Sequence, residues 1–477
     1  MALIILFFLT SSADSITSSV ILDQIDRCSP VTLDGVQIEG DLILDGLKPC
    51  EECNSSSLKP GEILIDSNFS IRNSTFLGKV SLQGAKFQKS VDMNGNVFLG
   101  ETSFKGAHFL QNCIFDRSSF SKGADFSGCH FRKLASFESS RLSEASFKDT
   151  DFSMDANFGR STFTGFASFE NAVFNKTANF YEAQFLGEAY LRGAKFCGNK
   201  ARFAGAIFNG VAGFSETRFN EAIFNEARFA SEARFMNANF LGRASFLGTN
   251  FEGEALFYKA NFSSQIDLTA CTFQQLFLHW NVIRDKVKVD ANGNIFKNMI
   301  DNYKRLGWLA DNSECYIDQR HWIMEKKPWT DPSKAADIFL ESYCGYGSRP
   351  ERTLCWIIPV IILFGLTYWK NGGIARIKKP DLESGKVKIM ARKEGENAYL
   401  IEFITPQPER DKSQAKSILR SLWFSFLIFS RRDTRDMHAE GNMEYWIIWE
   451  RRLGLVLFTI FTYYVGKLII SYFTPSP

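Results

Sequence analysis

The apolar positions in the first half of the chain recur at alternating steps of five and six residues, and most of them are phenylalanine. A small residue usually stands two positions earlier, as Ala156 does before Phe158 and Ala244 before Phe246. A helix face requires apolar residues three and four apart and a strand requires them two apart, so this spacing fits neither element. The side chains all point inward only if the chain turns a corner between them. The three longest runs are Phe98, Phe104, Phe109, Phe115, Phe120, Phe126, Phe131, Phe137; Phe158, Phe163, Phe169, Phe174, Phe180, Phe185; and Phe229, Phe235, Phe240, Phe246, Phe251, Phe257, Phe262.

Four sides of five, six, five and six residues close one square coil of 22 residues. Successive coils stack at a strand spacing of about 4.8 Å, which places each Phe on the Phe one coil away. We therefore predict ladders of Phe rings inside a column, in which each buried Phe contributes about 1.5–3 kcal/mol. The register runs from Leu33 to Phe273, which leaves room for roughly ten coils at that spacing. Local bulges are predicted where the register slips: near Phe147, near Phe224, and between Phe196 and Phe203.

This pattern resembles the pentapeptide-repeat family, whose members fold as right-handed quadrilateral β-helices. The resemblance covers about half the chain and implies an all-β solenoid. It says little about activity, because proteins of many roles share this fold. Some members are thought to mimic DNA with an acidic rod, but residues 76–277 carry 21 Lys and Arg against 19 Asp and Glu. A nucleic-acid mimic is therefore not expected.

Composition shifts along the chain predict a helical neck and two C-terminal transmembrane helices beside the solenoid. An apolar start followed by Ser11-Ser12-Ala13 is typical of a signal peptide, with an uncleaved apolar start as the alternative. Val20, Ile21 and Ile25 fit one helical face of a cap. The predicted segments are 1–13, signal peptide; 14–30, N-terminal cap; 31–277, β-helix with an insertion at 45–62; 278–352, helical neck; 353–370, first transmembrane helix; 371–452, basic loop with a short re-entrant or interfacial helix at 417–430; and 453–473, second transmembrane helix.

Two apolar runs near the C-terminus predict the membrane spans. Residues 354–369 carry no charge, and residues 453–473 carry one. The second run is long enough to cross a bilayer and the first nearly so. The loop between them, residues 370–452, holds 17 Lys and Arg against 12 Asp and Glu, and basic clusters flank both spans. By the positive-inside rule the loop is cytoplasmic, so the β-helix of this cell-membrane protein is expected outside the cytoplasm.

Some membrane proteins with this repeat also carry a two-span module similar to potassium channels, and this chain resembles that arrangement. The short apolar segment 421–430 between the spans is similar to a pore helix. A Gly-rich filter with coordinating carbonyls is expected next, but the sequence reads Arg431-Arg432-Asp433-Thr434-Arg435-Asp436. Gly345-Tyr346-Gly347 precedes the first span, where a turn is the simpler interpretation. A two-helix anchor without a filter is favoured over a channel.

The chemistry-bearing residues predict no catalytic, cofactor-binding or metal-binding site. The five His residues are widely separated, and no phosphate loop, nucleophile elbow or zinc-protease motif occurs. Asp290, Asn292 and Asn294 mimic the start of a calcium loop, but Ile295 replaces the Gly expected next, which favours a helix-starting turn. Outside the cell, a disulfide joining two of Cys28, Cys50 and Cys53 is expected, with the pairing left open. Cys113, Cys129 and Cys197 are expected to be small buried residues of the repeat.

From these features we expect a non-enzymatic membrane-anchored protein that acts as a surface scaffold or protein-interaction module. Its partners would be the lipid bilayer and an unidentified protein, with no nucleic acid and no cofactor. The alternative is an ion channel or channel-like sensor regulated by the β-helix. The sequence leaves the ligand and the oligomeric state open.

Overall fold

The computed structural model describes residues 14–44, 63–349, 351–377, 388–393, 399–404, 410–411, 417–432, 434, 437–439 and 443–473. The predicted signal peptide at 1–13 and the insertion at 45–62 lie outside these residues. The chain divides into two compact units, Met1–Cys315 and Tyr316–Pro477. The division falls within residues 278–352, the segment predicted as a helical neck.

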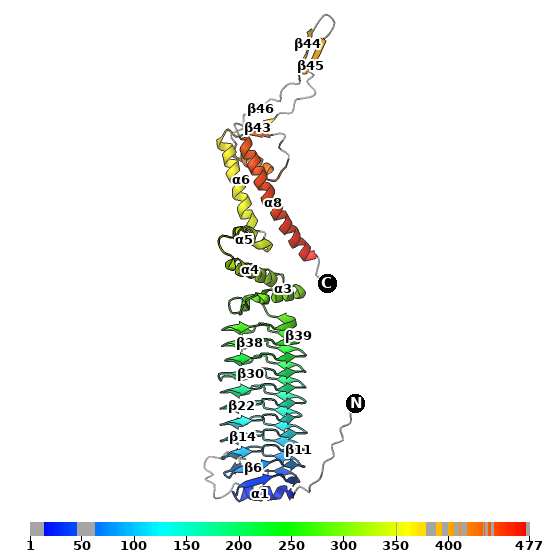
Figure 1. Cartoon of the computed structure of the whole chain (residues 1–477), viewed down its shortest axis with the longest axis vertical. Helices are drawn as coiled ribbons and strands as arrows, with labels where there is room; N and C mark the ends of the chain where they lie inside the picture. Colours follow the sequence, from blue (N-terminus) through cyan, green and yellow to red (C-terminus); the bar gives the residue numbers. More distant parts are fainter. Residues whose placement is uncertain are drawn as a thin grey trace. The chain divides into compact units, whose positions relative to one another are not determined.

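In the first unit, short parallel strands of successive coils pair along four sides and form the stack coloured blue to green in Figure 1. One side is an eleven-stranded sheet, which gives about eleven coils. Its strands are β2 (Val31–Asp34), β6 (Phe69–Arg72), β10 (Val91–Asp92), β14 (Cys113–Ile114), β18 (Ala135–Ser136), β22 (Ala156–Asn157), β26 (Ala178–Asn179), β30 (Ala201–Arg202), β34 (Ala222–Ile223), β38 (Ala244–Ser245) and β41 (Ile266–Asp267). A second side has ten strands: β5 (Ile63–Ile65), β9 (Ala85–Phe87), β13 (His108–Phe109), β17 (His130–Phe131), β21 (Asp151–Phe152), β25 (Val173–Phe174), β29 (Lys195–Phe196), β33 (Arg218–Phe219), β37 (Asn239–Phe240) and β40 (Asn261–Phe262).

The two remaining sides belong to one 21-stranded sheet, because the long strands β39 and β42 run along both. One of these sides contains β1 (Ser15–Thr17), β3 (Gln37–Glu39), β7 (Thr75–Phe76), β11 (Val97–Phe98), β15 (Ser119–Phe120), β19 (Arg141–Leu142), β23 (Thr162–Phe163), β27 (Gln184–Phe185), β31 (Ile207–Phe208), β35 (Arg228–Phe229), β39 (Asn250–Leu256) and β42 (Thr272–Phe277). The other adds β4 (Leu42–Ile43), β8 (Val80–Ser81), β12 (Thr102–Ser103), β16 (Ala124–Asp125), β20 (Ala145–Ser146), β24 (Ala167–Ser168), β28 (Ala189–Tyr190), β32 (Ala212–Gly213) and β36 (Ala233–Arg234).

The strand register confirms the 22-residue coil and its irregularities. Phe98 pairs with Phe120, one coil of 22 residues later. The coil that pairs Ala124 with Ala145 has 21 residues, and so has the coil that pairs Ala201 with Ala222. The coil that pairs Ala178 with Ala201 has 23. These coils coincide with the three predicted slips, and the 38 residues from Val31 to its partner Phe69 confirm an insertion in the first coil.

The interior of the first unit is made of the predicted Phe ladders. The rings of Phe98 and Phe120 stack at a centroid distance of 4.6 Å, and those of Phe104 and Phe126 at 5.1 Å. Neighbouring ladders meet edge to face, an arrangement that suits the charge distribution of aromatic rings. The small residue two positions before each Phe is also buried, as Ala156 is. The Phe rings, the small residues before them and aliphatic side chains such as Leu82 and Met93 together fill the column.

The N-terminal end of the stack is closed by β1, which pairs with β3, and by the helix α1 (Ser18–Asp26). The sheet thus begins before the predicted boundary at residue 31. Ile21 and Ile25 of α1 are buried, whereas Val20 is 44% exposed. The expectation that all three share the buried face was wrong for Val20, because one residue turns a helix by about 100°.

The other end of the stack is covered by α2 (Trp280–Ile283), α3 (Asn294–Leu306) and the first turns of α4 (Leu309–Lys326). The buried face of α3 contains Phe296, Met299 and Tyr303, and Trp280 packs against Phe296. Cys315 of α4 is fully buried in this unit. The segment 278–352, predicted as a helical neck, therefore contains the helices α3 and α4.

The second unit contains the end of α4, α5 (Pro332–Cys344), the 3₁₀ turn η2 (Gly345–Gly347), α6 (Arg352–Lys370), α7 (Ile418–Phe429) and α8 (Glu444–Phe473). Strand β43 (Ile374–Ile377) pairs with β46 (Arg410–Asp411) and β47 (Met437–Ala439), and β44 (Lys388–Lys393) pairs with β45 (Tyr399–Ile404). The predicted basic loop at 371–452 therefore contains strands. Its last residues belong to α8, which begins nine residues before the predicted span at 453–473.

Candidate functional site

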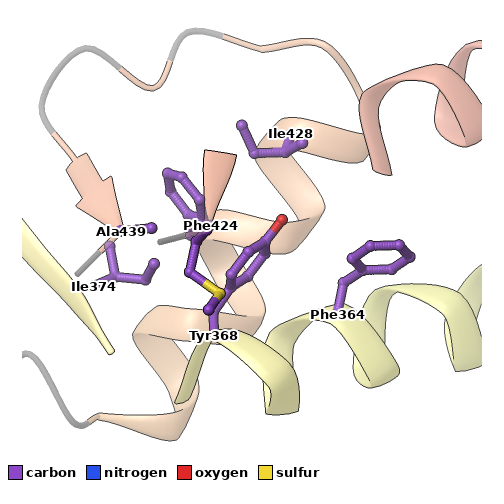
Figure 2. Close-up of a cluster of buried hydrophobic side chains, with 7 residues drawn as sticks. Phe364, Tyr368, Ile374, Phe424, Ile428 and Ala439 are labelled. Atoms are coloured by element: carbon purple, nitrogen blue, oxygen red, sulfur yellow. The ribbon is translucent and has the colours of Figure 1, made fainter. Parts of the chain in front are cut away.

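The C-terminal unit has an apolar core where α6, α7 and the short strands meet. Figure 2 shows the rings of Tyr368 from α6 and Phe424 from α7 next to each other, with Ile374 of β43 beside them. The two rings meet edge to face at a centroid distance of 5.4 Å. Phe364, Ile428, Ala439 and Met443 complete the cluster. Segments that are far apart in the sequence thus share one apolar core.

Two glycines allow α7 to approach both long helices closely. A Cβ atom at Gly365 of α6 would lie 2.7 Å from Leu422 Cδ2 and 3.0 Å from Leu422 Cα. A Cβ atom at Gly454 of α8 would lie 2.4 Å from the carbonyl oxygen of Phe429. Larger side chains at these two positions would push the helices apart. Small residues at helix contacts generally allow two helix backbones to approach closely. The positions of these glycines therefore fix α7 between α6 and α8.

A second apolar cluster joins α5 to this bundle. Tyr343 of α5 is fully buried and packs with Ile357, Phe429 and Leu457. Its hydroxyl group donates a hydrogen bond to the carbonyl oxygen of Leu457 at 2.7 Å. The predicted turn at 345–347 follows α5 directly as η2, with Tyr346 in the left-handed region at φ 53°. This confirms the interpretation of Gly345-Tyr346-Gly347 as a turn.

Polar groups inside the bundle centre on Glu450 of α8, which is fully buried. The hydroxyl group of Tyr368 lies 2.7 Å from Glu450 Oε2. Ser425 Oγ is in hydrogen-bond contact with Glu450 Oε1 and lies 2.8 Å from the carbonyl oxygen of Ile361. Sequence reasoning missed this group, because Glu450 was counted only among the charges of the loop. The signal available was the apolar run Tyr445-Trp446-Ile447-Ile448-Trp449 directly before the carboxylate.

Large apolar side chains cover the outside of the same helices. On α7, Leu419 is 75% exposed and Trp423 is 50% exposed, and Phe426 lies on the same face. Residues three and four apart lie on the same face of a helix. This apolar face of α7 therefore points away from the core of the unit. The other exposed large apolar residues are Leu354, Trp356, Ile358, Ile362, Leu363, Leu366 and Trp369 on α6, Ile418 on α7, and Tyr445, Trp446, Ile448, Trp449, Leu453, Leu455, Val456, Phe458 and Tyr463 on α8.

Among the described residues, one helix is long and apolar enough to cross a membrane, and it is α6. The predicted first span at 353–370 coincides with it. The predicted second span at 453–473 forms the C-terminal part of α8, and its crossing of a membrane stays a prediction. The short apolar helix α7 lies where the helix at 417–430 was predicted.

The segment after α7 turns sharply where a channel filter would begin. Arg431 adopts a left-handed backbone at φ 57°, and the N–H of Arg432 donates to the carbonyl oxygen of Leu427 at 2.8 Å. The chain then enters β47. Asp433, Arg435 and Asp436 lie outside the described residues.

Charged side chains on the column pair with each other between successive coils. Arg72 lies 2.6 Å from Asp92, and Arg228 lies 2.7 Å from Glu252. Comparable pairs are Lys79–Glu101, Arg160–Glu182 and Arg192–Glu216. Each such exposed pair contributes little to stability. The pairs distribute both signs along the column, in agreement with its near-neutral charge.

The remaining candidate residues lie apart from one another. His108 and His130 stack on neighbouring coils at 4.6 Å, His279 lies 3.0 Å from Asp311, and His321 lies 2.8 Å from Glu341. The side chain of His438 lies outside the part that the structure describes. Within that part, no three His, Cys, Asp or Glu side chains gather closely enough to hold a metal ion.

At the calcium-like segment, Asp290 Oδ2 accepts a hydrogen bond from Asn294 Nδ2 at 3.0 Å, just where α3 begins. This contact confirms the predicted helix-starting turn. Asn292 contributes no contact to it.

The cysteines follow the predictions in part. Cys28 is disulfide-bonded, while Cys50 and Cys53 lie outside the described residues. Cys113 and Cys129 are free and buried, as expected. Cys197 is exposed, which corrects the expectation for it, because it follows the inward Phe196 at a corner of the coil.

Comparison with known proteins identifies the repeat. The family model described as "Pentapeptide repeats (9 copies)" matches overlapping segments at 71–119, 82–130, 115–162, 126–173, 169–218 and 203–249. No curated protein matches the chain. Two trypsin-treated variants of QnrB1, a plasmid-mediated fluoroquinolone resistance protein, are similar solved structures at 20% sequence identity each. The first similarity covers 38% of this chain and 82% of that one with a TM-score of 0.19, and the second covers 49% and 89% with a TM-score of 0.15. The family model and the stacked 22-residue coils agree on residues 71–249, and this segment of the chain consists of pentapeptide repeats.

Proposed function

We propose that this protein is a membrane-anchored, non-enzymatic scaffold or protein-interaction module, in which the helical unit holds the pentapeptide-repeat column at a membrane surface. The observation that carries the proposal is the apolar exterior of α6, α7 and α8. Leu363, Leu419 and Val456 are 64%, 75% and 53% exposed, one on each helix. Large exposed apolar surfaces on a folded protein mark sites of contact with membranes or other proteins.

The lipid bilayer fits these helices better than a protein partner does. Large apolar side chains are exposed on α6 from Leu354 to Trp369, and Trp356 and Trp369 lie near its two ends, as in the aromatic belts of membrane helices. The basic residues that flank both apolar runs favour a cytoplasmic loop and an extracytoplasmic column. The proposed location is therefore the cell membrane, with two spans at 353–370 and 453–473.

Flotation of the full-length protein with liposomes tests the anchor. We expect the wild type to float with the lipid and to resist extraction by alkaline carbonate. A variant with Leu363→Lys, Leu419→Lys and Val456→Lys should remain in the dense fractions. The matched control places the same three charges at exposed leucines of the column, Leu77→Lys, Leu99→Lys and Leu186→Lys, and should float like the wild type. A wild-type protein that stays in the aqueous fractions as a monomer would overturn the proposal.

The second candidate function is an ion channel or channel-like sensor, which is favoured by the position of α7 between two long apolar helices. Bilayer recordings of the reconstituted protein separate the two functions. The anchor proposal predicts no currents above those of empty bilayers. Reproducible single-channel currents that disappear with the three-lysine helix variant would favour the channel.

A further inference from the structure

The helical unit buries one carboxyl group among hydroxyl groups. Tyr368 of α6 and Ser425 of α7 contact the two oxygens of Glu450, one each. Among the described residues, these two hydroxyl groups are the hydrogen-bond partners of the carboxyl group. The neighbouring charged residue on α8, Arg451, is exposed to solvent. A buried carboxylate without a cationic partner is strongly disfavoured relative to its neutral acid.

The hydroxyl group of Ser425 makes two contacts but carries a single hydrogen atom. One contact is with the carbonyl oxygen of Ile361 at 2.8 Å, and a carbonyl oxygen can only accept. If Ser425 donates there, its contact with Glu450 Oε1 requires the hydrogen atom to come from Glu450. Tyr368 then donates to the other carboxyl oxygen, Oε2, at 2.7 Å. One proton on Glu450 satisfies every group in the cluster.

We propose that Glu450 is held as a neutral carboxylic acid and forms a proton-binding site that links α6, α7 and α8. The acid donates to Ser425, Ser425 donates to the Ile361 carbonyl oxygen, and Tyr368 donates to the acid. When the proton leaves to solvent, a carboxylate remains, and the Ser425 hydroxyl group must turn from Ile361 to Glu450. The hydroxyl bond between α7 and α6 is then lost. Both hydroxyl groups lie at direct hydrogen-bond distance from the carboxyl oxygens, so the proton on the acid lies within a continuous chain of hydrogen bonds.

A protonated Glu450 sets the sign of a pH dependence of folding stability, whether or not the helices are inserted in a membrane. In the unfolded chain, Glu ionises with an ordinary pKa of about 4.3. Above that pH, the folded protein keeps a proton that the unfolded chain has lost, so folding stability falls as pH rises until the buried acid ionises as well. Glu450→Gln places an amide that donates to Ser425 and accepts from Tyr368 without titrating.

Thermal unfolding of the full-length protein in detergent, followed as a function of pH, tests the site. We expect the melting temperature of the wild type to fall relative to that of Glu450→Gln as pH rises above about 4.3. The control Glu444→Gln removes an exposed carboxylate from the first turn of the same helix and should follow the wild type. A Glu450→Gln variant that is less stable than the wild type by the same amount at every pH would overturn the proposal, because that result belongs to a carboxylate accepting two hydrogen bonds.

Infrared spectroscopy provides a readout that a purely structural role would not change. The wild type should show the C=O stretch of a protonated carboxylic acid that is missing in Glu450→Gln. Tyr368→Phe removes the hydrogen bond to Oε2 and should shift this band to higher frequency. Identical spectra of the wild type and Glu450→Gln in this region would reject the site. If Glu450→Gln does not fold, a band that stays unshifted in Tyr368→Phe rejects it.

Discussion

The side-chain amide of Asn302 forms hydrogen bonds with both the backbone N–H and the carbonyl oxygen of Leu276, at the last coil of the column. The N–H of Leu276 donates to Asn302 Oδ1 at 3.0 Å, and Asn302 Nδ2 donates to the Leu276 carbonyl oxygen at 2.8 Å. Both residues are fully buried. The amide thus takes the place of the next strand in the sheet, and α3 protects an edge that would otherwise invite pairing with another chain.

Replacing Asn302 by Ala should destabilise the first unit by about 2–4 kcal/mol, because a buried N–H and a buried carbonyl group lose their partners. Asn298→Ala, an exposed change on the same helix, should cost little. Denaturant unfolding measures both effects, and hydrogen exchange at the Leu276 amide locates the first. Slow exchange at this amide in Asn302→Ala would show that another group closes the edge.

Replacing one Phe of a ladder by Ala should lower the unfolding free energy far more than replacing an exposed Phe by Ala. Phe158 is fully buried and stacks with Phe137 and Phe180 at 5.2 and 5.0 Å. Phe158→Ala is expected to cost about 3–5 kcal/mol in unfolding free energy. Phe166 is 44% exposed, and Phe166→Ala should cost about 1 kcal/mol or less. Equal losses in denaturant unfolding would contradict the ladder as the source of stability.

The close contact between α7 and α8 predicts a difference between two glycines of one helix. The side chain introduced by Gly454→Val would clash with the backbone of Phe429. The substitution should therefore lower stability by about 1–3 kcal/mol. Gly466 has no heavy atom within 4 Å of the position of a new Cβ, so Gly466→Val is the matched control. Melting temperatures in detergent compare the two variants. A loss confined to Gly466→Val would show that the helices pack through another face.

Acidification should lower the folding stability of the C-terminal end of the column, because Asp267 becomes protonated. Burial raises the pKa of Asp267, but hydrogen bonds from Lys288 at 2.9 Å and from Thr269 outweigh it, and the pKa lies below its ordinary value. The stability that this carboxylate contributes is therefore present above the unfolded pKa of about 3.9 and is lost as pH falls through the lower folded value.

Urea unfolding at several pH values checks this sign. At neutral pH, Asp267→Asn should be less stable than the wild type by about 1–3 kcal/mol, because a charged hydrogen bond is lost. The difference should shrink below about pH 4 as the wild-type carboxylate becomes protonated. A difference that grows on acidification would contradict the assignment of Lys288 as its partner.

The sequence predicted the column well because one physical requirement repeats along it. Every inward position demands an apolar side chain, so even the one-residue irregularities near Phe147 and Phe224 were visible in the spacing. Cys197 shows the limit of the pattern. Its place inside the repeat was clear from the sequence, but whether a corner residue points inward depends on the turn taken after Phe196.

The helical unit was harder to predict because its contacts join distant residues. Hydropathy located α6 and α7, but the charges at 450–452 interrupted the apolar run and placed the start of the last helix at 453 rather than at Glu444. Glu450 lies 82 residues from Tyr368 in the sequence. Asn302 and Leu276, 26 residues apart, form an equally specific contact that no local pattern indicates.

The most direct test of the membrane-anchored column is the sidedness of the chain in intact cells. After replacement of the exposed Cys197 and Cys355 by Ser, one new cysteine is placed in the loop, Asn397→Cys, or on the column, Lys195→Cys. With a membrane-impermeant maleimide, the column cysteine should be labelled in intact cells and the loop cysteine only after permeabilisation. Labelling of both cysteines from the same side would contradict two membrane spans between an outer column and a cytoplasmic loop.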